Sequence, residues 1–81
     1  MLVRIRLFAR LREIAGAAEL ERHLPDGATA LTAWDALARD YPAMGPLKGT
    51  LSCAVNEEYA RMTTALADGD EVAFLPPVSG G

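Results

Sequence analysis

The sequence predicts a small two-layer α+β domain, in which one main helix packs on one face of a small sheet. Three observations support this fold class. The chain has 81 residues, which is enough for one domain. Several segments alternate apolar and polar residues with the period of two that is typical of strands, and one segment repeats its apolar residues at helical spacing.

The first strand is predicted in residues 2–9, LVRIRLFA. Val3, Ile5 and Leu7 fall on one side of an extended chain and the arginines between them fall on the other, so one face of this strand is expected to be buried. Phe8 interrupts the alternation because it lies on the arginine side. The sequence leaves open whether Phe8 marks a bulge or a contact surface.

A short helical turn and a second strand are predicted next. Residues 10–16 form a short segment that ends at Gly16, a typical helix stop. Residues 18–25, AELERHLP, alternate again and predict a strand. The Asp26–Gly27 pair after it predicts a turn.

The main helix is predicted to begin after Thr29, whose side chain suits an N-cap. Its apolar residues recur at steps of three and four and form one stripe, which comprises Leu31, Trp34, Leu37, Ala38 and Tyr41. Pro42 is expected to end the helix. The following residues, 42–49, are rich in proline and glycine and predict a loop, with or without a helical turn.

Three more strands are predicted in the C-terminal half. Residues 51–59 alternate, with Cys53 on the apolar side, where we expect it to be a buried hydrophobic residue rather than a nucleophile. Residues 60–66 predict a short strand. After a turn at residues 68–70, the last strand is expected in residues 71–75.

Composition excludes several classes of function. One histidine and one cysteine cannot supply the usual four ligands of a zinc site, and no glycine-rich phosphate loop is present in the interior. A net charge of -3 argues against a nucleic-acid partner. There is no apolar run of ~18 residues and no signal peptide, so we expect a cytoplasmic protein without a membrane partner.

The last six residues, PPVSGG, have a distinct composition. Pro76 and Pro77 fix φ and remove two backbone donors, so residues 76–81 are expected to leave the sheet as an extended tail. Gly80 and Gly81 lack Cβ atoms and can enter a narrow channel. The reactive group of this tail is the terminal carboxylate of Gly81, and the tail suits delivery of an acyl group into another protein's active site.

The C-terminal sequence DGDEVAFLPPVSGG closely resembles that of the small subunit of molybdopterin synthase, the MoaD type of ubiquitin-like sulfur carrier. The segment FARLREIAG after the first strand is also similar to this family, and the resemblance covers essentially the whole chain. It implies the β-grasp, or ubiquitin-like, fold: a small mixed sheet with one main helix on one face. Residues 1–75 would form this domain and residues 76–81 the tail.

The resemblance also implies a chemical role. An ATP-dependent enzyme related to ubiquitin-activating enzymes would adenylate Gly81, and a persulfide-bearing donor would convert the adenylate to a thiocarboxylate. The tail residues Pro76, Pro77, Val78, Ser79 and Gly80 would thread Gly81 into the large synthase subunit, where sulfur passes to a cyclic pyranopterin precursor. The chain itself would bind no cofactor and would be a non-catalytic subunit in a complex of two small and two large subunits.

Other roles share the same activated di-glycine end. Related carriers supply sulfur for thiamine synthesis or transfer-RNA thiolation, and some ubiquitin-like proteins become attached to lysines. An interaction module whose glycines have no chemical role is a further alternative. The double proline favours the molybdopterin role over the thiamine role, since the tails of thiamine-pathway carriers generally lack it.

The last strand also predicts a docking surface. Phe74 and Leu75 are adjacent, so their side chains must point to opposite faces of the sheet. We expect Phe74 to face Trp34 of the helix. Leu75 should then lie on the outer face at the base of the tail, where together with Phe8 it would form an apolar patch for partner proteins.

Overall fold

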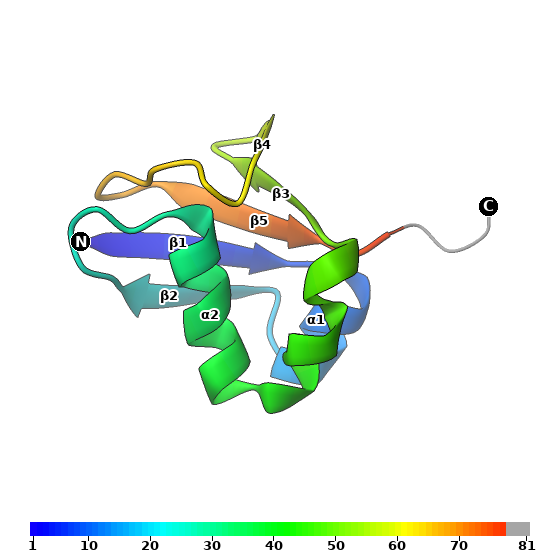
Figure 1. Cartoon of the computed structure of the whole chain (residues 1–81). Helices are drawn as coiled ribbons and strands as arrows, with labels where there is room; N and C mark the ends of the chain where they lie inside the picture. Colours follow the sequence, from blue (N-terminus) through cyan, green and yellow to red (C-terminus); the bar gives the residue numbers. More distant parts are fainter. Residues whose placement is uncertain (78–81) are drawn as a thin grey trace.

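A five-stranded mixed sheet forms the centre of the molecule, and the helices cover one of its faces (Figure 1). The computed structural model describes residues 1–77. The strands are β1 (Leu2–Leu7), β2 (Glu19–His23), β3 (Ser52–Val55), β4 (Glu58–Ala60) and β5 (Glu71–Leu75). Their order in the sheet is β2-β1-β5-β3-β4, with β1 and β5 parallel and the other neighbours antiparallel. The helices are α1 (Ala9–Ala15), α2 (Ala30–Asp40) and the 3-10 helix η1 (Pro42–Thr50). The predicted α+β class with a β-grasp sheet is confirmed.

The core lies between the sheet and the helices. Val3, Ile5 and Leu7 of β1 are all buried, as their alternation predicts. Val72 and Phe74 of β5 lie in the same layer. The opposite face of the sheet carries Arg4 and Arg6 of β1 and Glu71, Ala73 and Leu75 of β5, all exposed or partly exposed.

The helix α2 begins with a capping box. Thr29 accepts a hydrogen bond from the Thr32 backbone N–H, and the Thr32 hydroxyl accepts one from the Thr29 N–H. These bonds satisfy donors that have no partner within the helix. Trp34 and Leu37 of the predicted stripe are fully buried, whereas Leu31, Ala38 and Tyr41 are only partly buried. The small residues Ala30 and Ala33, which the prediction left out, are buried in their place.

Two segments are more helical than predicted. The helix α1 has seven residues instead of one turn, and it ends at Gly16, whose φ of 72° is left-handed. The expected loop at residues 42–49 is the 3-10 helix η1, which is held to the core by fully buried Met44. A single buried side chain in a proline- and glycine-rich segment gives no periodic signal.

The predicted third strand is in fact a hairpin. Asn56 and Glu57 have φ values of 52° and 70°, so the chain reverses there and β4 follows at Glu58–Ala60. The strand predicted at residues 60–66 was wrong. Only its first residue, Ala60, belongs to a strand, at the end of β4. The rest of the segment makes an isolated bridge to Thr29, and its carbonyls accept hydrogen bonds from the first N–H groups of α2, from Ala30 at 3.0 Å and Leu31 at 2.8 Å.

No helix within residues 1–77 is long and apolar enough to cross a membrane.

Candidate functional site

The tail leaves the sheet from a central strand. The strand β5 pairs with β1 on one side and β3 on the other, and this pairing continues to its last residues, with Phe74 opposite Leu7 and Leu75 opposite Ser52. Pro76 follows directly and cannot donate to a sheet ladder. The start of the tail is therefore anchored on both sides (Figure 1).

The residues predicted to carry the chemistry are Gly81, Gly80, Ser79 and Val78, and they lie outside the described residues. Pro76 is partly exposed and Pro77 is exposed at the end of the described chain. The threading role of the tail and the adenylation of Gly81 therefore stay predictions.

The two faces of β5 are assigned as the alternation predicts. Phe74 is fully buried, and its ring meets Trp34 of α2 edge-on, with the centroids 5.3 Å apart and the planes at 67°. Leu75 is partly exposed and lies on the opposite face. The contact of Phe74 with Trp34 anchors β5 in the core, while Leu75 stays available to a partner.

Leu75 and Phe8 line the same hollow on the outer face of the sheet. The hollow measures about 230 Å³ and is lined by Arg6, Phe8, Ala54, Glu57, Tyr59, Glu71, Ala73 and Leu75. Phe8 has extended backbone angles and is the N-cap residue of α1, so it marks no bulge. The Arg6 guanidinium lies over its ring, 5.3 Å from the centroid.

A chain of charges borders this hollow. The Glu71 carboxylate lies between two arginines, 3.7 Å from Nη2 of Arg4 and 3.7 Å from Nη1 of Arg6. Arg4 also approaches Glu19 at 3.8 Å. The ion pairs are partly exposed, so their contribution to stability is small. Their effect here is to hold Arg6 beside Phe8.

Sequence reasoning missed Tyr59, which is 85% exposed and reaches the same hollow from β4. Its position depends on the tight turn at Asn56 and Glu57, because this turn makes Tyr59 the cross-strand partner of Ala54. A continuous strand over residues 51–59 would have placed it elsewhere. A clue was available in the sequence, since asparagine tolerates the left-handed backbone of such turns.

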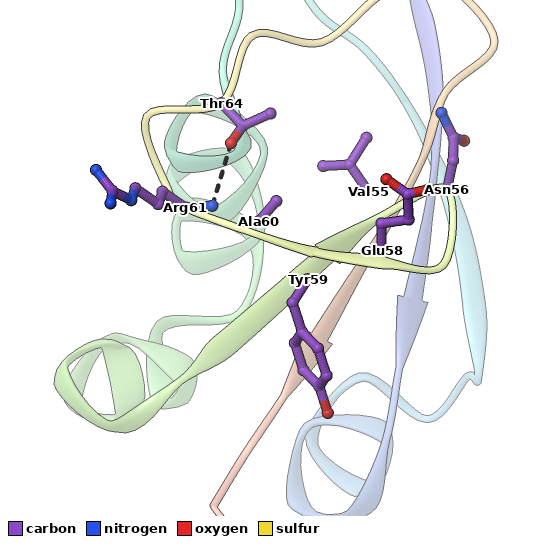
Figure 2. A pocket seen from close by; sticks show the side chains of 7 residues that line it. All are labelled: Val55, Asn56, Glu58, Tyr59, Ala60, Arg61 and Thr64. Atoms are coloured by element: carbon purple, nitrogen blue, oxygen red, sulfur yellow. Dashed lines mark hydrogen bonds between the residues drawn. The ribbon is translucent and has the colours of Figure 1, made fainter.

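A larger hollow of about 670 Å³ runs along the edge strand β4 and contains none of the predicted site residues. Figure 2 shows Arg61 beside Thr64, whose hydroxyl accepts a hydrogen bond from the Arg61 N–H at 3.1 Å. Tyr59 also lines this larger hollow, with its ring pointing away from Arg61 and Thr64 (Figure 2).

The lone cysteine lies in the core. Cys53 is buried, its thiol donates to the Ala60 carbonyl at 3.3 Å, and burial raises its pKa. The expectation that Cys53 is a core residue is confirmed. Within residues 1–77 no group of three or more histidine, cysteine, aspartate and glutamate side chains could hold a metal ion.

Comparisons with known proteins agree with the fold and the tail sequence. The family model described as the ThiS family matches residues 5–81. The molybdopterin synthase sulfur carrier subunit of Chlamydomonas reinhardtii is 40% identical, and the alignment covers 100% of both chains. The crystal structure of small archaeal modifier protein 1 from Haloferax volcanii matches with a TM-score of 0.88 at 35% identity and 100% coverage of both chains.

A solved assembly is also similar. In the complex of subunits 1 and 2 of the molybdopterin-converting factor from Helicobacter pylori, one chain matches with a TM-score of 0.69 at 26% identity, again with 100% of both chains covered. The family match spans nearly the whole sequence, including the glycine end. The chain therefore belongs to the ThiS family, and its resemblance to the MoaD-type sulfur carriers is confirmed along its whole length.

Proposed function

We propose that this chain is the sulfur-carrying small subunit of a molybdopterin synthase and that the C-terminal carboxyl group of Gly81 carries the sulfur atom. One observation supports this most strongly. The chain aligns from end to end with relatives named molybdopterin synthase sulfur carrier subunit, including the segment that holds the terminal glycines. The anchored root of the tail on β5 suits this role, because a rigid base presents a thin reactive end.

The proposed chemistry proceeds in steps, and partner proteins supply every reacting group except the Gly81 carboxylate. A carboxylate oxygen of Gly81 attacks the α-phosphorus of ATP in an activating enzyme, and pyrophosphate leaves. The terminal sulfur of a protein persulfide then attacks the acyl carbon, and AMP leaves. A thiol reduces the resulting sulfur–sulfur bond and frees the thiocarboxylate. ATP and the persulfide donor belong to these partners, and the chain itself binds no cofactor.

The contribution of this chain is positioning. Six residues from Pro76 to Gly81 span at most roughly 20 Å, enough to cross the wall of a partner protein. The prolines restrict the first part of the tail, which lowers the entropy lost on binding. Glycines at the end leave the terminal carbonyl open to attack from either side.

The outer-face hollow is the proposed docking surface for the large subunit. Leu75, Phe8 and Tyr59 present apolar area around it, and Leu75 is next to the start of the tail. A partner that covers this face would also receive the tail. The Helicobacter pylori assembly of subunits 1 and 2 supports such a complex, and we propose two small and two large subunits.

The direct test is intact-mass spectrometry of the chain after incubation with activating enzyme, ATP and a persulfide donor. The wild-type chain is expected to exchange one terminal oxygen for sulfur. A variant with one residue appended after Gly81 should unfold at the same temperature as wild type and yield a chain that cannot support synthase activity. Full activity from the extended chain would refute the carrier role.

A second test concerns the width of the channel. Gly80→Val should leave thermal unfolding unchanged and lower the rate of sulfur loading by about a hundredfold, because its Cβ displaces the reacting carbonyl. Ser79→Ala removes atoms at the neighbouring position and is the control. Gly80→Val loading at the wild-type rate would show that the tail does not work by threading.

Protein modification is the second candidate, because small archaeal modifier protein 1 matches the whole chain. The two roles differ in where Gly81 goes. A carrier returns to a free carboxylate after each cycle, whereas a modifier stays joined to a lysine by an amide. Peptide mapping of adducts formed in extract separates them.

A further inference from the structure

The end of the molecule from which the tail leaves carries unpaired positive charge, although the whole chain has a net charge of -3. Two cations define this tail pole: Arg12 on α1 and Lys48 on η1, and both are exposed. The helix α1 begins shortly after Leu7, which pairs with Phe74, and η1 ends two residues before Ser52, which pairs with Leu75. Both helices therefore lie beside the last residues of β5 (Figure 1).

Arg12 and Lys48 are two of the four arginine and lysine side chains without an ion pair within residues 1–77; the other two are Arg39 at the end of α2 and Arg61 after β4, on other elements of the molecule. Arg4 and Arg6 are paired with Glu71, Arg10 with Glu13 at 3.4 Å, and Arg22 with Asp40 at 2.9 Å. Within the described residues neither Arg12 nor Lys48 has an ion pair or a side-chain hydrogen bond. Their charges are free to act on another molecule.

The opposite end of the sheet is acidic. Glu57 lies in the β3–β4 turn, Glu58 is the first residue of β4, and the loop before β5 carries Asp68 and Asp70. The aspartates have structural tasks, since Asp68 accepts from the Leu2 N–H and Asp70 from the Ala67 N–H. The unpaired cations of the tail pole and these four acidic side chains therefore lie toward opposite ends of β5, so that an acidic surface attracts the tail pole and repels the far end.

The position of the cations decides what they can act on. Gly81 is separated from Leu75 by the whole tail, up to roughly 20 Å of extended chain. Charges are largely screened beyond about 8 Å at physiological ionic strength. Arg12 and Lys48 are therefore too far from the end of an extended tail to stabilise its reacting carbonyl, and a partner surface near the start of the tail is within their range.

We propose that Arg12 and Lys48 dock on an acidic rim around the channel of the large subunit and bring the chain to it tail first. This inference rests on the proposed function and adds the charge of the partner surface. The outer-face hollow supplies apolar contact, whereas the tail pole sets the orientation of approach. Charges at the rim of an interface act mainly on the association rate and its salt dependence.

The test is a stopped-flow measurement of association with the large subunit from the same organism, at low and high salt. Arg12→Glu and Lys48→Glu are each expected to lower the association rate about tenfold at low salt, with the difference shrinking at high salt. Arg61→Glu is the matched control. It makes the same change in net charge at an exposed arginine that points away from the sheet at β4, and it should have less effect (Figure 2).

The outcomes separate the two proposals. If the wild-type chain binds and delivers sulfur but all three variants associate equally fast, the acidic-rim inference is wrong and the carrier role stands. If Arg12→Glu and Lys48→Glu slow adenylation by the activating enzyme but not association with the large subunit, the acidic-rim inference is also wrong. If the wild-type chain does not bind the large subunit, both proposals fail. Arg12→Gln, followed by urea unfolding, checks that any loss does not come from the stability of α1, because a stability defect would persist at high salt.

Discussion

At the scale of single residues, two neighbours in β5 have separate tasks. Phe74 is fully buried against Trp34, and Leu75 borders the outer hollow beside Phe8. The alternation of a strand enforces this division, because consecutive side chains point to opposite faces. One residue stabilises the domain and the next is left for the partner.

This division predicts opposite effects of two substitutions. Phe74→Ala should lower the free energy of unfolding by about 3–5 kcal/mol, since it leaves a cavity in the core. Leu75→Asp should change stability little and weaken binding of the large subunit about tenfold or more. Urea denaturation and titration calorimetry measure the two quantities, and a reversal of the two effects would contradict the assignment of the faces.

Asp70 is expected to make stability depend on pH in acid. A hydrogen bond from the Asn56 amide at 3.0 Å and one from the Ala67 N–H hold its pKa below the usual range. A carboxyl whose pKa is lower in the folded state stabilises above its unfolded pKa, about 3.9, and loses this contribution as the pH falls through the folded value.

The wild-type chain should therefore lose more stability between pH 5 and pH 2 than Asp70→Asn does. Asp26→Asn, at an exposed aspartate without a hydrogen bond in the described chain, is the control. Urea unfolding at several pH values measures the difference. An identical acid dependence in wild type and Asp70→Asn would show that this carboxyl is not linked to folding.

At the scale of elements, the β3–β4 turn places Tyr59 on the outer face. Asn56 and Glu57 both have positive φ, the geometry of a two-residue hairpin turn. Asparagine tolerates this backbone, whereas glutamate is strained in it. The turn is also joined to β5, because the Glu71 N–H donates to the Asn56 side chain at 3.0 Å.

Replacing each of two adjacent glutamates by glycine should change the free energy of unfolding in opposite directions. Glu57→Gly relieves left-handed strain of about 1–2 kcal/mol and adds flexibility to the unfolded chain, for a net gain of about 0.5–1 kcal/mol. Glu58→Gly lies in β4 and should lose about 0.5–1 kcal/mol. Equal effects in thermal unfolding would show that backbone strain at Glu57 is negligible.

The long, regular elements were predictable from the sequence and the short ones were not. Alternation in β1 and β5 and the stripe of α2 each repeat enough times to define a buried face. The strand β4 has only three residues and follows a turn without glycine, so its pattern merged with that of β3. For the site, Leu75 and Phe8 followed from the alternation, while Tyr59 required the register of the hairpin.

At the scale of the whole molecule, the sheet places the tail on its central strand. The first and last strands are parallel neighbours, so β5 is held by residues from both halves of the chain. A partner that binds the tail therefore pulls on the central strand of the sheet. The tail pole could not be predicted from the sequence, because Arg12 and Lys48 are far apart along the chain and only the packing of α1 on β5 and of η1 on α1 brings them to one end.

The measurement that tests the central claim most directly is a single turnover with a chain that already carries sulfur on Gly81. This chain is mixed with the large subunit and the pterin precursor, and intact masses of the chain and the product are followed together. We expect the chain to exchange its terminal sulfur for oxygen at the rate at which the pterin gains sulfur. A pterin that gains sulfur while the chain keeps its own, or a chain that never delivers it, would contradict the account.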